Sequence, residues 1–177
     1  MKLLDFFQAV GKLKTIKRTG WINHKVPDPE SVADHSFRVA FIAMILAPKL
    51  GANVEKSIKM GLIHDIGEAK VGDVLKFQGR AALSDAEEKL KKETTAVKEI
   101  TALIDGDEYF ALFNEYVENK TKEAQLVKQI DKLERALQAY EYEKQTNIDL
   151  QDFFESAEVL VKEPVLKEIL EEIKKLR

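Results

Sequence analysis

Hydrophobic residues recur along most of the chain at the three- and four-residue spacing of amphipathic helices, without the strict alternation of a half-buried strand. The pattern predicts helices over residues 2–14 and 107–119, and helices that begin at Ser31, Asn53, Ser84, Thr121, near Asp149 and at Glu163. None of the intervening segments is long enough to read as an interdomain linker. Residues 1–177 are therefore predicted to form a single all-α domain, a compact helical bundle.

Three of these helices carry apolar stripes whose placement can be predicted. The stripe of the first helix is expected to face the core, and it consists of Leu3, Leu4, Phe7, Val10 and Leu13. Residues 37–46 are apolar almost all round, so their helix is expected to be central and buried. The last helix has a stripe that packs either on its own domain or on a second copy of the chain, formed by Leu166, Ile169, Leu170 and Ile173.

Composition and charge narrow the classes of function. The 28 basic and 31 acidic residues nearly balance, at a net charge of −3, which gives no field for binding nucleic acid. The absence of cysteine excludes disulfides, thiolate metal ligands and a cysteine nucleophile. Asp5 interrupts the N-terminal apolar residues, and no apolar run is long enough for a membrane span. These features predict a cytoplasmic protein that binds neither membranes nor nucleic acids.

Four polar residues fall where the apolar pattern points inward: His35, the adjacent pair His64 and Asp65, and Asp131. Taken singly, a buried histidine is more often a hydrogen-bonded core residue, and an aspartate near a stripe is more often a helix cap. Together they bring two imidazoles and two carboxylates from three helices to one core, which is how helical bundles build metal sites. A divalent cation removes the burial penalty of all four, and the ligand set suits Mn, Co, Fe, Ni, Zn or Mg.

The same residues, His35, His64-Asp65 and Asp131, resemble the signature of the HD-domain metal-dependent phosphohydrolases. Four segments are similar to the small 5'-deoxynucleotidase branch of that superfamily: RTGW (18–21), PESVADHS (29–36), HDIGEAKVGD (64–73) and QIDKLERALQAYEYE (129–143). The resemblance implies an HD-domain bundle with the metal in its core, a dimer, and a phosphatase for deoxyribonucleoside 5'-monophosphates. It also implies that His35, His64, Asp65 and Asp131 hold the metal.

The resemblance further implies catalytic roles for Glu68 and Asp73, which handle the attacking water and, in some relatives, a second metal. Arg18 is the candidate cation for the phosphate, although it also fits a solvated basic run with neighbouring lysines. Trp21 either stacks on the nucleotide or anchors its loop in the core. Two other functions stay open: hydrolysis of a cyclic nucleotide or nucleoside triphosphate, and a non-catalytic metal-containing binding domain.

Overall fold

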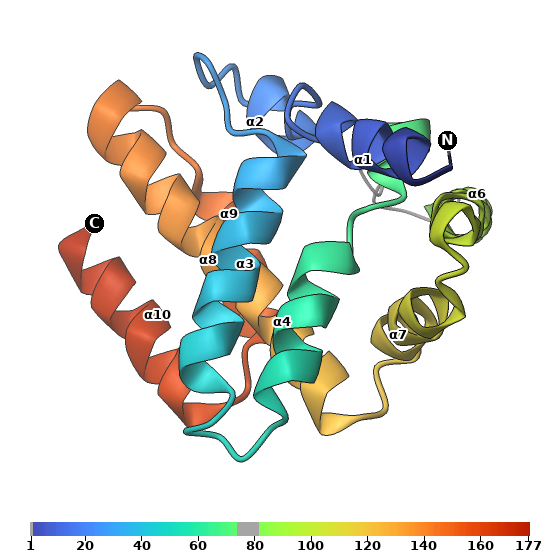
Figure 1. The fold of residues 1–177 in the computed structure, drawn as a ribbon. Helices are drawn as coiled ribbons and strands as arrows, with labels where there is room; N and C mark the ends of the chain where they lie inside the picture. The colour runs from blue at the N-terminus through green and yellow to red at the C-terminus, as the bar shows by residue number, and fades with distance from the viewer. Residues whose placement is uncertain (1, 74–81) are drawn as a thin grey trace.

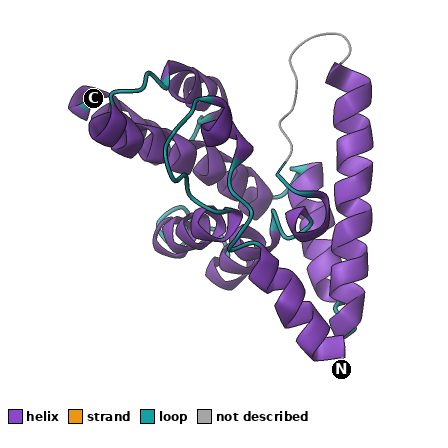
Figure 2. Ribbon diagram, turned by 90° about the horizontal axis from the view of Figure 1, so that it is seen from above, coloured by secondary structure: helices purple, strands orange, loops and turns teal. Residues whose placement is uncertain are grey.

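The computed structural model describes residues 2–73 and 82–177, and throughout these residues the regular secondary structure is helical (Figure 2). The predicted all-α fold is thus confirmed. In chain order the elements are α1 (Lys2–Lys12), α2 (Thr19–Asn23), α3 (Val32–Leu46), α4 (Val54–Ile63), α5 (Glu68–Val71), α6 (Ala82–Thr101), the 3₁₀ turn η1 (Ala102–Ile104), α7 (Asp107–Glu118), α8 (Lys122–Thr146), α9 (Gln151–Leu160) and α10 (Pro164–Leu176). Within the described ranges, no helix combines the length and the apolar character that crossing a membrane requires.

The predicted helix starts are largely confirmed, because the capping side chains make the expected bonds. Ser31 and Asp34 form a reciprocal capping box at the start of α3. Asn53 and Thr121 accept backbone N–H groups at the starts of α4 and α8. Pro164 occupies the first turn of α10. By contrast, α6 begins at Ala82, before the predicted start.

The centre of the bundle is formed by α3, α4 and α8, which contact one another. In Figure 1, α3 and α4 lie side by side, with α8 behind them. Helices α9 and α10 pack against α8 on one side, and α6 and α7 lie on the other side of the molecule (Figure 1). The short helices α1 and α2 lie at one end of the bundle (Figure 1). This arrangement places the N-terminal half of α3 next to the end of α4 and the middle of α8.

Two hydrophobic clusters make up the core. The larger is formed mainly by α3, α4, α8, α9 and α10. The smaller joins the end of α4 and the turn after it to α6 and α7. On α3, Val32 belongs to the smaller cluster and Val39 to the larger one, so His35 lies between them along the helix. The junction of the two clusters is where the buried polar residues collect.

The predicted inward stripe of the first helix is wrong for most of its members. Leu3, Leu4 and Phe7 are 50%, 51% and 58% exposed, and only Leu13, just beyond α1, is buried. The helix instead packs on the smaller cluster through Phe6 and Ala9, and Leu13 continues this row beyond the end of α1. That row has the same helical spacing as the predicted one, so periodicity could not decide which row is covered.

Helix α3 is central, as predicted, but it is buried on one face only. Its inner face carries His35, Val39 and Ala43, whereas Phe37 and Phe41 on the outer face are 65% and 52% exposed. The reason is that the neighbours α4 and α8 cover one face only. The stripe of α10, by contrast, lies on its own chain, because Leu166, Leu170 and Ile173 join the larger cluster.

Candidate metal centre

His35 supplies the first candidate ligand from the inner face of α3. Its ring is fully buried, and its Nδ1 lies 2.5 Å from Oε2 of Glu134 on α8. The other ring nitrogen, Nε2, lies 3.2 Å from Oδ1 of Asp131 but makes no hydrogen bond. A carboxylate at Nδ1 favours the tautomer with the proton on that atom, which leaves the Nε2 lone pair for a ligand.

His64 supplies a second ring nitrogen from the turn that follows α4. The helix predicted to begin at Asn53 does not continue through His64 to Glu68, because α4 ends at Ile63 and α5 begins at Glu68. The intervening turn is closed by bonds of the three-residue type, such as that from the Glu68 N–H to the Asp65 carbonyl. Nδ1 of His64 lies 2.7 Å from the Gly61 carbonyl, and its buried Nε2 has no hydrogen-bond partner.

A close contact between α3 and α4 brings the two imidazoles together. A Cβ atom on Gly61 would lie only 2.9 Å from the Ala40 Cα, so glycine is required for this approach. The ring centroids of His35 and His64 are 5.4 Å apart as a result. Only a residue without a side chain allows the backbones to approach in this way.

All four predicted metal ligands converge at this point. One ligand atom from each of His35, His64 and Asp131 lies within 4.8 Å of the other two. Asp65 completes the group, with Oδ2 at 3.3 Å from His64 Nε2 and 3.9 Å from His35 Nε2. Two imidazole nitrogens without hydrogen bonds and two carboxylates form a donor set that fits a divalent cation. The family signature therefore corresponds to one buried cluster of candidate ligands.

The electrostatics of the cluster reflect close coupling of opposite charges. Burial acts to raise the pKa of Asp65, but His64, Arg18 and His35 outweigh it and hold that pKa well below its usual range. Burial and Arg18 act to lower the pKa of His35, yet Glu134 and Asp131 raise it to about 9. The carboxylates are thus ionised and attract positive charge to the centre.

Arg18 lies in the site rather than in a solvated basic run. Its Nη1 donates to Oδ2 of Asp65 at 2.7 Å, and only 12% of the side chain is exposed. Asp73 lies beside it, 4.0 Å from Arg18 Nε, and accepts the Thr19 N–H at 2.6 Å. The Thr19 hydroxyl also donates to the Asp73 carbonyl. These two hydrogen bonds from Thr19 to Asp73 hold the start of α2 against the edge of the centre.

Glu68 is buried beside the four ligands, at 3% exposure, and its Oε2 has no hydrogen-bond partner. Burial, together with Asp65 and Asp73, raises the pKa of Glu68 to about 10. Glu93 of α6 joins Asp65 and Glu68 in a second group whose ligand atoms lie within 4.8 Å of one another. Gly67 permits this approach, because a Cβ there would lie 3.0 Å from atoms of Glu93.

Trp21 occupies the hydrophobic core, which corresponds to the anchoring alternative. Its ring is 1% exposed and stacks on Phe153 with centroids 4.1 Å apart. Tyr142 packs edge-on against it at 5.2 Å, and the indole N–H donates to Glu30 at 2.9 Å. This burial also explains why α2 forms in a segment, between residue 14 and Ser31, for which the hydrophobic pattern predicts no helix.

Sequence reasoning missed Glu134, Lys132 and Glu93. Glu134 follows Asp131 by one helical turn, so the i, i+3 spacing could have identified it as a second inward carboxylate. Lys132 Nζ lies 2.7 Å from Oδ2 of Asp131, although adjacent residues do not normally share a helix face. Glu93 comes from a separate helix, and no sequence spacing connects it to Glu68.

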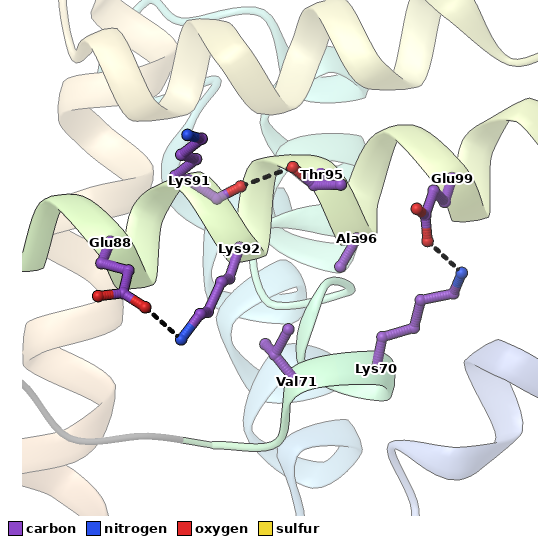
Figure 3. Close-up of a pocket in the computed structure, with 8 residues that line it drawn as sticks. All are labelled: Lys70, Val71, Glu88, Lys91, Lys92, Thr95, Ala96 and Glu99. Carbon is purple, nitrogen blue, oxygen red and sulfur yellow. Dashed lines mark hydrogen bonds and ion pairs between the residues drawn. The ribbon is translucent and has the colours of Figure 1, made fainter. Parts of the chain in front are cut away.

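A surface pocket between α5 and α6 is a different feature (Figure 3). Its lining residues are Lys70, Val71, Glu88, Lys91, Lys92, Thr95, Ala96 and Glu99. Two of its lysines pair with glutamates of α6, Lys70 with Glu99 and Lys92 with Glu88, each at 2.6 Å (Figure 3). The predicted site residues are not part of this lining, so the buried cluster is the candidate functional site.

The sequence of the chain is similar to a family profile and to named proteins over nearly its full length. The sequence profile of the HD domain matches residues 10–174. The chain is 45% identical to a Dictyostelium discoideum protein named 5'-deoxynucleotidase HDDC2, over 94% of this chain and 93% of that protein. It is 37% identical to the human protein of the same name, over 97% of this chain and 84% of that protein.

Solved structures agree with the sequence comparison. A conserved hypothetical protein from Pyrococcus furiosus is 41% identical, covers 97% of this chain and 99% of its own, and superposes with a TM-score of 0.79. A Pyrococcus horikoshii protein is 36% identical, with a TM-score of 0.81 over 98% of this chain and 99% of its own. With the sequence signature, the buried cluster and these matches in agreement, the chain belongs to the HD domain family.

Proposed function

We propose that this protein is a 5'-deoxynucleotidase, a metal-dependent phosphomonoesterase that converts deoxyribonucleoside 5'-monophosphates to deoxynucleosides and phosphate. The observation that carries the proposal is the convergence of His35, His64 and Asp131, with Asp65 beside them. Relatives named 5'-deoxynucleotidase match this chain over nearly its full length. Glu68 beside Asp65 and Asp73 beside Arg18 are carboxylates beyond the four ligands that a closed structural metal site requires, which favours hydrolysis over a binding scaffold.

His35, His64, Asp65 and Asp131 are the proposed ligands of a divalent cation. A cation held by these four residues would supply Lewis-acid chemistry: it would polarise a phosphoryl oxygen and lower the pKa of a bound water toward neutral pH. Mn, Co, Mg, Fe, Ni and Zn are all compatible with two nitrogen and two oxygen ligands. The hydrogen bonds at Nδ1 of both histidines support this assignment, since they orient the rings with Nε2 toward the carboxylates.

Glu68 and Asp73 are proposed to handle the attacking water. Glu68 can orient the water through its Oε2, and its ionised carboxylate can accept the water's proton. The positive charges of Arg18 and of a bound cation favour this ionised form. Asp73 holds Arg18 and Thr19 at the rim of the centre. If a second cation binds, Glu68 is its expected ligand, together with Asp73 as predicted or with Glu93, which has a ligand atom within 4.8 Å of those of Asp65 and Glu68.

Arg18 is proposed to bind the substrate phosphate, with Lys132, which pairs with Asp131, as a further cation. We expect Arg18→Lys to lower kcat/KM for deoxynucleotides roughly 10- to 100-fold, because the charge remains but the planar fork that binds two oxygens is lost. Steady-state phosphate release measures the effect, with Lys17→Met as the matched control because Lys17 pairs with exposed Asp28. Unchanged kinetics in the loaded Arg18→Lys variant would remove Arg18 from substrate binding.

The decisive experiment is a phosphate-release panel. Purified protein is supplied with Mn²⁺, Co²⁺ or Mg²⁺ and offered deoxyribo- and ribonucleoside 5'-monophosphates, cyclic nucleotides and nucleoside triphosphates. We expect inorganic phosphate from deoxynucleoside monophosphates, and none after chelation or in Asp131→Asn. Release of pyrophosphate or a ring-opened nucleotide, identified by chromatography, would establish another substrate, and no turnover of any of these compounds would favour a binding domain.

A homodimer is also proposed, with the outer face of α3 as the contact. Phe37, Phe41, Met44 and Ile45 follow helical spacing and are all exposed, and the rings of Phe37 and Phe41 lie 6.0 Å apart. Monomeric proteins seldom leave such a patch uncovered. A second copy is the expected occupant, since the family resemblance implies a dimer and a two-fold axis brings the same patch of each copy together.

Phe41→Glu is therefore expected to convert a dimer into a monomer without unfolding it, because the side chain is already half exposed. Sedimentation velocity and circular dichroism measure the two properties. Val159→Glu on α9 is the control, because Val159 is equally apolar in character and 65% exposed. A wild-type protein that sediments as a 20.1 kDa monomer contradicts the proposal.

A further inference from the structure

Glu134 is a buried carboxylate with two different partners. Its Oε2 lies 2.5 Å from Nδ1 of His35, and its Oε1 accepts from Nε of Arg38 at 2.8 Å. Both Glu134 and His35 are fully buried. Each carboxylate oxygen is thus committed, one to a candidate metal ligand and the other to a guanidinium.

Arg38 reaches this carboxylate from α3, three residues after His35. Its Nη2 donates to Gln138 at 2.5 Å and its Nη1 to Glu141 at 2.8 Å. Glu134, Gln138 and Glu141 follow one another on a single face of α8, at the spacing i, i+4, i+7. The planar guanidinium therefore holds the Glu134 carboxylate in a fixed place relative to both helices.

The ring orientation of His35 depends on the position of the Glu134 carboxylate. An imidazole whose Nδ1–H meets a fixed carboxylate is held in one tautomer and one ring orientation, and the basicity of Nε2 rises. A buried carboxylate without a compensating positive charge is strongly unfavourable, so Glu134 would move or take up a proton if Arg38 were absent. Either change would weaken the acceptor that orients the ring.

We propose that Arg38 is a positioning residue of the metal centre, which acts through Glu134 to keep Nε2 of His35 directed at Asp131 and His64. Arg38 bonds Glu134, Gln138 and Glu141 rather than any of the four candidate ligands, and its side chain is 26% exposed. The inference rests on the proposed function in so far as the cluster binds a cation. The proposal adds Arg38 to the residues that shape the centre, and Arg38 acts on it only through the carboxylate of Glu134.

The test uses direct measurement of cation binding, so that it does not depend on turnover. Mn²⁺ affinity is measured by calorimetry, and the ligand field is followed by the visible spectrum of the Co²⁺-loaded protein. We expect Arg38→Met and Glu134→Gln each to weaken Mn²⁺ binding roughly 10- to 100-fold and to alter the Co²⁺ spectrum. Arg38→Lys should recover part of the affinity, because it restores the charge but not the fork.

Glu141→Gln is the matched control. It changes another acceptor of Arg38 on α8 but leaves both bonds of Glu134 in place, so Mn²⁺ affinity and the Co²⁺ spectrum should match the wild type. If the contact only joins α3 to α8, Arg38→Met will lower the melting temperature and leave affinity and spectrum unchanged, which would overturn the proposal. Should Arg38→Met fail to fold, unchanged binding in both Arg38→Lys and Glu134→Gln would overturn it.

The outcomes separate this proposal from the proposed function. A protein that binds Mn²⁺ with the expected dependence on Arg38 but releases no phosphate from deoxynucleotides would contradict the function alone. Turnover of deoxynucleotides with unchanged Mn²⁺ binding in Arg38→Lys and Glu134→Gln would contradict the positioning role alone. A wild-type protein that binds neither Mn²⁺ nor Co²⁺ would overturn both.

Discussion

Replacing Glu68 by glutamine is expected to lower kcat roughly 10²- to 10⁴-fold, the usual contribution of a general acid or base, while the protein stays folded and binds its cation. The amide has the size of the carboxyl group but cannot accept the proton of an attacking water. Glu68 is buried and its Oε2 has no hydrogen-bond partner, so glutamine at this position breaks no hydrogen bond of that atom. The measurement is kcat for deoxynucleotide hydrolysis, alongside bound metal per chain and the melting temperature.

Glu55→Gln is the control for this prediction, because Glu55 is an exposed residue of α4 that pairs with Lys59 one helical turn further on. Its kcat should equal that of the wild type. Full activity in Glu68→Gln would exclude Glu68 from proton transfer. Loss of folding or of the cation in that variant would instead indicate a structural carboxylate.

The central helices and their candidate ligands could be predicted because local signals coincide there. Ser31 and Asp34 fix the start of α3, and the periodicity of that helix then fixes the inward direction of His35. The long stripe of α8 likewise places Asp131 at the buried edge. In such segments capping and periodicity point to one arrangement, so the sequence alone locates the residues.

Other features depend on contacts between segments that are distant in sequence. Periodicity could not show that His64 follows the end of α4, because the turn is set by the close approach at Gly61 and Gly67. It could not show that Glu93 reaches Glu68, nor that Phe153 covers Trp21. The buried row of α1 and the exposed face of α3 are mispredicted for the same reason. The hydrophobic pattern of a helix does not show which other helices pack against it.

The burial of the ligand cluster leads to a second large effect, on stability. Removal of the divalent cation by a chelator is expected to lower the melting temperature by roughly 5 to 10 °C, if the free cation exceeds its Kd about 100-fold beforehand. The physical reason is that a cation that binds only the folded chain stabilises it by mass action. When the cation is removed, the ionised carboxylates of Asp65 and Asp131 lose their strongest positive partner and keep only the adjacent rings of His64 and His35.

Differential scanning calorimetry with and without chelator measures this shift. Asp131→Asn removes a ligand, so its melting temperature should no longer respond to the chelator, whereas Asp28→Asn, at an exposed site, should keep the full response. Equal melting temperatures of the loaded and chelated wild type would mean that the cluster is satisfied by its own charges. His35, with its pKa raised to about 9, would then act as the internal cation between Asp131 and Glu134, and the centre would be a buried ion network rather than a metal site.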